Sequence, residues 1–213
     1  MRVLFARVDT QVAATWGMWR TGVVMAAVGL LGFQAFHVLE HGIQIGYWFG
    51  HPQAAPFLTP WAVVGRDVLA APLGRGPAGG AELLHLVGNL LFLGGLLLLA
   101  AVWRYDGRSA GLRTEYGVRR LRWATWAQVL HVGEHVLLTT TFLFAGSANG
   151  LSTGFGALPA GPVGGAVRVW VHFVLNAIPT VLVGVALYRG WTAAQRTSPA
   201  GVGREAPLLE PVG

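Results

Sequence analysis

The sequence of 213 residues contains no cysteine and no lysine, and only 11% of its residues are charged. The lack of cysteine excludes disulfides, thiolate-ligated iron–sulfur clusters, cysteine zinc sites and thiol nucleophiles. Soluble domains carry about 25% charged residues. The low charge and the 54% share of hydrophobic residues therefore indicate an integral membrane protein. All 15 basic residues are arginines beside apolar runs, where they are typical of contact with a lipid bilayer and not of nucleic-acid binding.

Four apolar segments reach the roughly 20 residues that a membrane-spanning helix needs. They are residues 21–48, 81–103, 121–145 and 166–188. Arginines crowd the N-terminal segment, the loop after the second span and the C-terminal tail. By the positive-inside rule, both termini and that loop are predicted to be cytoplasmic. We expect the protein in the plasma membrane of a prokaryotic cell.

Polar motifs inside the spans occur twice along the chain with the same spacing. The first span contains Gln34, His37, Glu40 and His41, and the third contains Gln128, His131, Glu134 and His135. The second span contains His85 and Asn89, and the fourth contains His172 and Asn176. This duplication predicts an all-α, integral membrane four-helix bundle built from two tandem two-helix repeats, related by a pseudo-twofold axis along the membrane normal.

The repeats divide the chain into regions. A cytoplasmic N-terminal segment at 1–20 precedes repeat 1 at 21–105, and a cytoplasmic Arg-rich loop at 106–120 precedes repeat 2 at 121–190. Residues 191–213 contain Pro, Gly and Ser without apolar periodicity, which predicts a disordered cytoplasmic tail. Repeat 1 includes a long outer loop, and we expect its apolar stretch at 56–73 to lie on the membrane surface or dip into it.

Helical periodicity places the polar residues of each span on one face. In the first span they occupy an arc of about 120°, and the rise of about 1.5 Å per residue puts the histidines of all four spans in the outer half of the bilayer. The six histidines are therefore expected to meet inside the bundle. Arg168, near the outer end of the fourth span, is expected to contact lipid headgroups.

An ionised glutamate near the bilayer centre costs about 2.5–3.5 kcal/mol, so the two intramembrane glutamates need partners. Hydrogen bonds between helices contribute only about 0.6–2 kcal/mol each, and so large a cluster exceeds what helix association needs. We therefore predict a metal site. The predicted ligands are His37, Glu40, His41, His85, His131, Glu134, His135 and His172, with Gln34, Asn89, Gln128 and Asn176 orienting them from outside. Glu40 and Glu134 are also the predicted catalytic groups.

The ligand types favour iron or copper over zinc, because imidazole combined with carboxylate is usual for non-haem iron and imidazole also suits copper. The number of ligands permits one shared ion or a dinuclear site with one ion in each half. Haem is the alternative cofactor, held by histidines on facing helices such as His37 with His131, or His85 with His172. Haem leaves the paired glutamates unexplained.

The leading interpretation is a redox enzyme of oxygenase or oxidase type that acts on a lipophilic or small apolar substrate. The alternatives are a haem-binding electron-transfer protein, a metal or proton translocator, and an accessory subunit of a larger membrane complex with a redox partner. The apolar run at 90–102 argues against a continuous conduit. Residues 84–92 resemble the His-x-x-x-Asn helix of rhomboid proteases, but the Gly-x-Ser-Gly nucleophile motif of those enzymes does not occur, which excludes serine proteolysis.

Overall fold

Helices form almost all of the described part of the chain. The computed structural model describes residues 2–52, 57–105, 114–158 and 161–196. The helices are α1 (Arg2–Gly50), α2 (Pro60–Ala70), α3 (Gly76–Tyr105), α4 (Glu115–Ala145) and α5 (Pro162–Arg196), with short 3₁₀ helices η1 (Ala71–Leu73) and η3 (Leu151–Gly156). These residues contain no strand, so the predicted all-α class is confirmed.

Three of the described helices are long and apolar enough to cross a membrane. They are Trp19–Gly50 within α1, Gly76–Tyr105 as α3 and Pro162–Ala193 within α5. α4 has 31 residues and is long enough, but it is less apolar because it combines arginines near its start with the polar motif further along. Three of the four predicted spans are thus supported, and the span at 121–145 stays a prediction.

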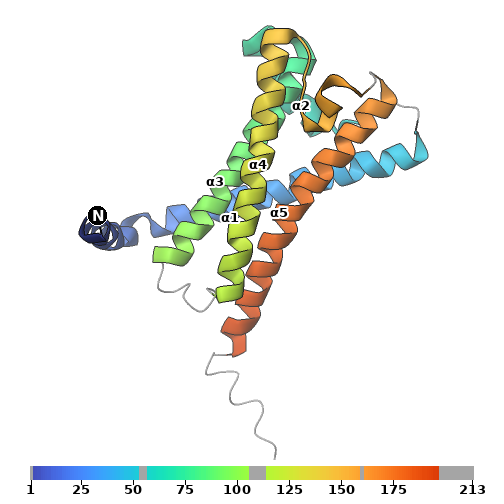
Figure 1. Cartoon of the computed structure of the whole chain (residues 1–213). Coiled ribbons are helices and arrows are strands. Elements are labelled where there is room, and N and C mark those ends of the chain that lie inside the picture. Colours follow the sequence, from blue (N-terminus) through green and yellow to red (C-terminus); the bar gives the residue numbers. More distant parts are fainter. Residues whose placement is uncertain (1, 53–56, 106–113, 159–160, 197–213) are drawn as a thin grey trace, which may run out of the picture.

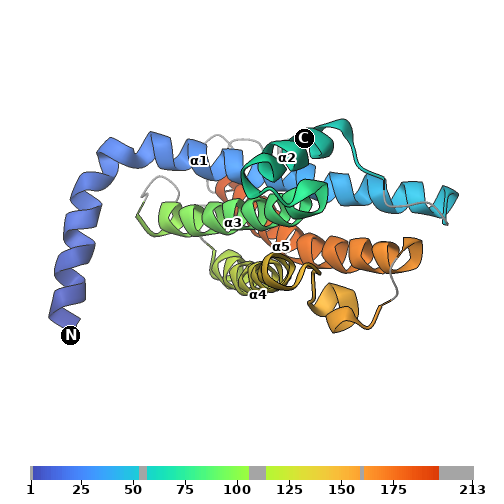
Figure 2. The same ribbon diagram turned by 90° about the horizontal axis from the view of Figure 1, so that it is seen from above.

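The four long helices pack in a closed order. α1 contacts α3 and α5, and α4 contacts the same two helices. Figure 1 shows α3, α4 and α5 side by side with α1 crossing them obliquely, and Figure 2 shows α3 and α5 between α1 and α4. We call the end of the bundle that carries α2 and η3 the α2 end (Figure 1). Side chains from all four long helices meet in the interior.

The interior has an apolar part, far from the α2 end, and a polar part. The apolar part consists of Phe92, Leu96, Leu99, Val102, Trp103, Leu121, Ala124, Val183 and Ala186. Large apolar side chains also cover the outside of the bundle: Phe36 is 69% exposed and Leu130 is 73% exposed. Buried polar residues together with exposed apolar ones are the arrangement expected of helices surrounded by lipid.

α2 lies against the start of α3. Thr59, in an extended conformation, precedes α2, and Pro60 occupies its first turn, where the fixed φ of proline favours a helix start. A Cβ on Gly80 of α3 would collide with the backbone oxygen of Arg66, so only glycine lets the two helices come this close. Trp61 and Val64 are exposed, as expected of an apolar stretch at a membrane surface. Residues 53–56, which include the first residue of the predicted stretch, lie outside the described residues.

Helix boundaries differ from the predicted regions. The N-terminal segment is helical and continuous with the first span, because α1 begins at Arg2. Residues 106–113 of the predicted Arg-rich loop lie outside the described residues, and α4 begins within that loop, where the Thr114 hydroxyl accepts a hydrogen bond from Gly117 N. α5 continues to Arg196, beyond the predicted start of the tail, and residues 197–213 lie outside the described residues.

The contact between α1 and α3 depends on Gly95. A Cβ on Gly95 would lie 2.9 Å from Leu30 Cβ, whereas a Cβ on the neighbouring Gly94 would lie 3.8 Å from Leu30 Cδ1. Both alanine substitutions gain about 1 kcal/mol of helix propensity. The difference between the melting temperatures of the two variants therefore reports how the added methyl group packs against Leu30. We expect Gly95→Ala to lower the melting temperature of the detergent-solubilised protein relative to Gly94→Ala, because overpacking costs about 1–3 kcal/mol. Equal melting temperatures would contradict this contact.

Candidate metal centre

Six histidine rings from the four long helices form one buried cluster. α1 contributes His37 and His41, α3 contributes His85, α4 contributes His131 and His135, and α5 contributes His172. The centroids of neighbouring rings lie 4.7–6.2 Å apart, and every ring has at least two such neighbours. His51 lies outside the cluster, stacked on Tyr47.

Three of these histidines offer nitrogens close enough for one ion. His131, His135 and His172 are buried, and their candidate ligand atoms lie within 4.8 Å of one another. The Nε2 atoms of His131 and His135 are 3.2 Å apart. Nitrogens bound to one ion at about 2.0–2.1 Å are about 2.8–3.4 Å apart in octahedral or tetrahedral geometry. This pair therefore has a spacing that suits two ligands of a shared ion and also a hydrogen bond between the two rings.

Hydrogen bonding does not satisfy the whole cluster. Within the described part of the chain, five of its ring nitrogens are buried without a hydrogen-bond partner: His37 Nε2, His41 Nε2, His131 Nδ1, His135 Nδ1 and His172 Nε2. A buried polar atom without a partner costs about 1–3 kcal/mol, and folded proteins leave few of them. The rings thus have more donor and acceptor capacity than their protein neighbours use.

The four amides predicted around the metal lie about one helical turn further from the α2 end. Gln34 Nε2 donates to Asn176 Oδ1, and Gln128 Nε2 donates to Asn89 Oδ1, both at 2.9 Å. The side chains of Asn89 and Asn176 donate in turn to the backbone oxygens of the histidines four residues before them. All four residues are fully buried. These bonds tie α1 to α5 and α4 to α3, so the amides fix the helices that carry the rings.

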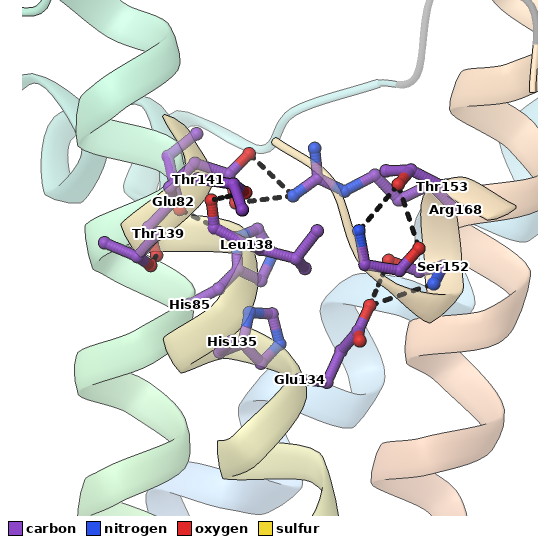
Figure 3. A network of polar contacts seen from close by, with 12 residues as sticks. Glu82, His85, Glu134, His135, Leu138, Thr139, Thr141, Ser152, Thr153 and Arg168 are labelled. Carbon is purple, nitrogen blue, oxygen red and sulfur yellow. Dashed lines mark hydrogen bonds and ion pairs between the residues drawn. The ribbon is translucent and has the colours of Figure 1, made fainter. Parts of the chain in front are cut away.

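The two glutamates bind segments at the α2 end. Glu40 accepts hydrogen bonds from the backbone N–H and the hydroxyl of Thr59 at the start of α2. Glu134 accepts from Leu151 N at 2.9 Å, and from the backbone and hydroxyl of Ser152 at 2.9 and 2.8 Å (Figure 3). Each carboxylate satisfies free N–H groups at the beginning of a short helix. The group of three close histidines does not include these predicted ligands and catalytic residues.

An ion pair that was not predicted lies beside the histidines at the α2 end. Arg168 Nη2 donates to both carboxylate oxygens of Glu82 at 2.6 Å, and the side chains are 27% and 6% exposed (Figure 3). The pair links α3 to α5, one turn beyond His85 and His172. The expectation that Arg168 contacts lipid headgroups is corrected, because its guanidinium neutralises a buried carboxylate. The sequence contains a signal for this pair, because its two residues have opposite charges and nearly equivalent positions in the two repeats. Glu82 is three residues before His85, and Arg168 is four residues before His172.

The chain belongs to a family of unknown function, DUF6008, whose family model matches residues 2–205. No curated protein and no solved structure matches the chain. The geometry of the site is therefore the basis for a functional proposal.

Removing Arg168 tests the ion pair. Loss of one partner from a buried pair costs about 3–5 kcal/mol, and the partial exposure of Arg168 lowers this cost. We expect Arg168→Gln to lower the melting temperature in detergent more than Glu82→Gln/Arg168→Gln, because the double variant leaves no unpaired carboxylate. Arg66→Gln, which breaks a surface pair with Asp67, is the control and should melt near the wild type. A double variant no more stable than Arg168→Gln would argue against the pair.

Proposed function

We propose that the protein is an integral membrane metalloprotein whose metal centre is built on His131, His135 and His172, and that it acts as an oxidoreductase of oxygenase or oxidase type. The observation that carries the proposal is the group of three buried imidazoles with ligand nitrogens within 4.8 Å of one another. Neutral imidazoles bind copper, iron, zinc and nickel. Three protein ligands leave a further coordination position for a small molecule.

For a redox function we favour copper, then iron, over zinc, because zinc has no redox chemistry, although three histidines with an open position also bind zinc. Non-haem iron sites commonly combine histidines with a carboxylate. The nearest carboxylates in the predicted motifs, Glu40 and Glu134, are held by Thr59 and Ser152. A bound copper or iron ion would supply one-electron redox chemistry. The role of the chain is to hold the ion among buried rings, and the amide pairs keep the helices in register around it.

A cavity beside the histidine cluster supports a lipophilic substrate. It has a volume of about 260 Å³ and lies between α1, α2 and α3. Most of its lining is apolar or aromatic, from Phe33, Phe36, Trp61, Ala62, Gly65, Leu84 and Gly88, and its polar residues are His37 and Glu40. Phe36 and Trp61 are exposed on the outside of the bundle, where lipid would lie. An uncharged apolar molecule can therefore reach the cluster from the side.

Haem is supported less well as the cofactor. The ring centroids of His85 and His172 are 5.7 Å apart, but His135 packs on both of these rings at 5.5 and 4.7 Å. A porphyrin between the two histidines would have to displace His135. Translocation is also disfavoured, because the apolar core closes the interior between the cluster and the end of the bundle opposite the α2 end.

The proposal places the α2 end outside the cell, with both termini in the cytoplasm of a prokaryotic cell. Arg104, Arg120 and Arg122 lie near the opposite end, as the positive-inside rule requires.

We include α4 as the fourth span and retain the tandem duplication. Two observations support this: α1 and α4 contact the same two helices, and Glu40 and Glu134 hold the segments that follow their helices. An oxidoreductase also needs a redox partner or a place in a larger membrane complex.

Metal analysis of the purified protein tests the centre. We expect the detergent-solubilised wild type to contain a transition metal by inductively coupled plasma mass spectrometry. His135→Ala should lose the ion held by His131, His135 and His172, because two ligands bind a metal far more weakly than three. His51→Ala removes the histidine outside the cluster and should keep the wild-type metal content. A Soret band would indicate haem instead, and an unchanged metal content in His135→Ala would refute the assigned ligands.

Photolabelling with a small apolar diazirine tests the cavity. The reagent should label Leu84 and His37, which line the cavity, in the wild type. Gly88→Leu is expected to reduce this labelling several-fold, because a Cβ there has only ordinary contacts with Phe33 and the longer side chain fills the cavity. Labelling of Leu97, exposed on the same helix, should not change. Unchanged labelling of Leu84 and His37 would show that the cavity does not admit apolar molecules.

A further inference from the structure

A second set of three histidines lies beside the first. His37 and His41 on α1 are spaced like His131 and His135 on α4, and His85 on α3 corresponds to His172 on α5. The ring centroids of this second set are 4.7, 5.7 and 5.7 Å apart. Those of the first set are 4.9, 5.9 and 4.7 Å apart. Each half of the chain thus supplies a group of three imidazoles with similar ring spacing. Among the described residues only the first set has its ligand nitrogens within 4.8 Å of one another, so binding of an ion by the second set requires a rotation of its rings.

Two rings of the second set have their hydrogen positions fixed by neighbours. His85 Nδ1 lies 2.8 Å from the backbone oxygen of Ala81, and His41 Nδ1 lies 2.9 Å from Gln44 Oε1. Both oxygens can only accept, so Nδ1 carries the hydrogen in each ring. In a neutral ring the lone pair is then on Nε2. Metal-binding histidines in proteins are oriented in the same way, with the other ring nitrogen donating to an oxygen.

Two free nitrogens of this set are buried. His37 Nε2 and His41 Nε2 are inaccessible to solvent and have no hydrogen-bond partner among the described residues. The side chain of His41 is 1% exposed. An acceptor nitrogen in this position requires a donor or a cation, and the surrounding residues supply neither. A metal ion satisfies several such nitrogens at once.

Gln44 connects this set to a negative charge. Its side-chain oxygen accepts from His41, and its nitrogen donates to Glu40 Oε1 at 3.3 Å. A carboxylate linked to a histidine in this way increases the basicity of the ring and offsets the charge of a bound cation. Leu138 occupies the corresponding place in α4, so the first set has no equivalent link.

We propose that His37, His41 and His85 form a second metal site, so that the protein holds two metal ions side by side. This inference rests on the proposed function, because it assumes that the first set binds an ion. The rings of the two sets are in contact: His85 lies 5.5 Å from His135 and 5.7 Å from His172. Because the rings are in contact, ions held by the two sets would be close enough for their unpaired electrons to interact. The second ion adjoins the apolar cavity, which His37 lines.

Copper titration of the full chain tests the second site. The protein is stripped of metal with a chelator in detergent and titrated with Cu²⁺, and bound copper and the electron paramagnetic resonance spectrum are recorded. The wild type and the control His51→Ala should bind two equivalents and show an interacting pair of ions. His85→Ala and His135→Ala should each bind one equivalent, with the spectrum of an isolated ion.

The outcomes separate the second site from the proposed function. A wild type that binds one equivalent, lost in His135→Ala but kept in His85→Ala, overturns the second site and leaves the first. One equivalent lost in both variants means a single shared ion and also overturns the inference. A wild type that binds no copper, or any other transition metal, overturns the proposed function itself.

A variant that keeps all six histidine rings distinguishes a lost metal ligand from a misfolded protein. Gln44→Leu places in α1 the residue type that α4 has at the corresponding position, and it removes the bond that orients His41 together with the longer bond from Gln44 to Glu40. We expect Gln44→Leu to lower the affinity for one of the two copper ions by about 10–100-fold and to leave the affinity for the other unchanged. Equal affinities in Gln44→Leu and the wild type would show that this histidine is not a ligand.

Discussion

Burial of polar side chains between apolar helices is the constraint on which the structure depends. A group placed there without a partner destabilises the fold, and lipid supplies none. The amides meet this constraint by pairing, Gln34 with Asn176 and Gln128 with Asn89. The carboxylates meet it through backbone N–H groups or Arg168. The imidazoles are the exception, because five of their nitrogens are buried without partners in the described structure. An ion bound by Nε2 of His37, His41 or His172 would relieve part of this imbalance, whereas Nδ1 of His131 and His135 would still lack partners if their Nε2 atoms held the ion.

The glutamates make contacts that their position in the motif does not reveal. The motif places them next to histidines, and mixed histidine and carboxylate sites are common. Glu134 holds the segment from Gly150 to Ser152, and a Cβ on Gly150 would lie 2.8 Å from both carboxylate oxygens. Glu40 likewise holds the start of α2, which forms one wall of the apolar cavity. The carboxylates therefore also shape the surroundings of the proposed centre.

The two halves have similar parts but different surroundings. The set of His131, His135 and His172 has its ligand nitrogens closer together. The set of His37, His41 and His85 has the oriented rings, the link through Gln44 to Glu40, and the adjacent cavity. In the proposed enzyme, an ion held by the second set would lie nearer the apolar cavity, and an ion held by the first set would lie among rings close to the ion pair of Glu82 and Arg168. Equivalent motifs can thus serve unequal roles.

The sequence by itself determined the helical class, three apolar helices, and which polar residues share a helix face, because these properties follow from composition and from local periodicity. Local spacing cannot state what a side chain meets on another helix or loop. Only the tertiary structure decided that Glu40 and Glu134 bind Thr59 and Ser152, and that Glu82 pairs with Arg168. The same holds for the three histidines whose nitrogens converge. Those contacts depend on the rotation and offset of each helix against its neighbours, which packing across the whole bundle sets.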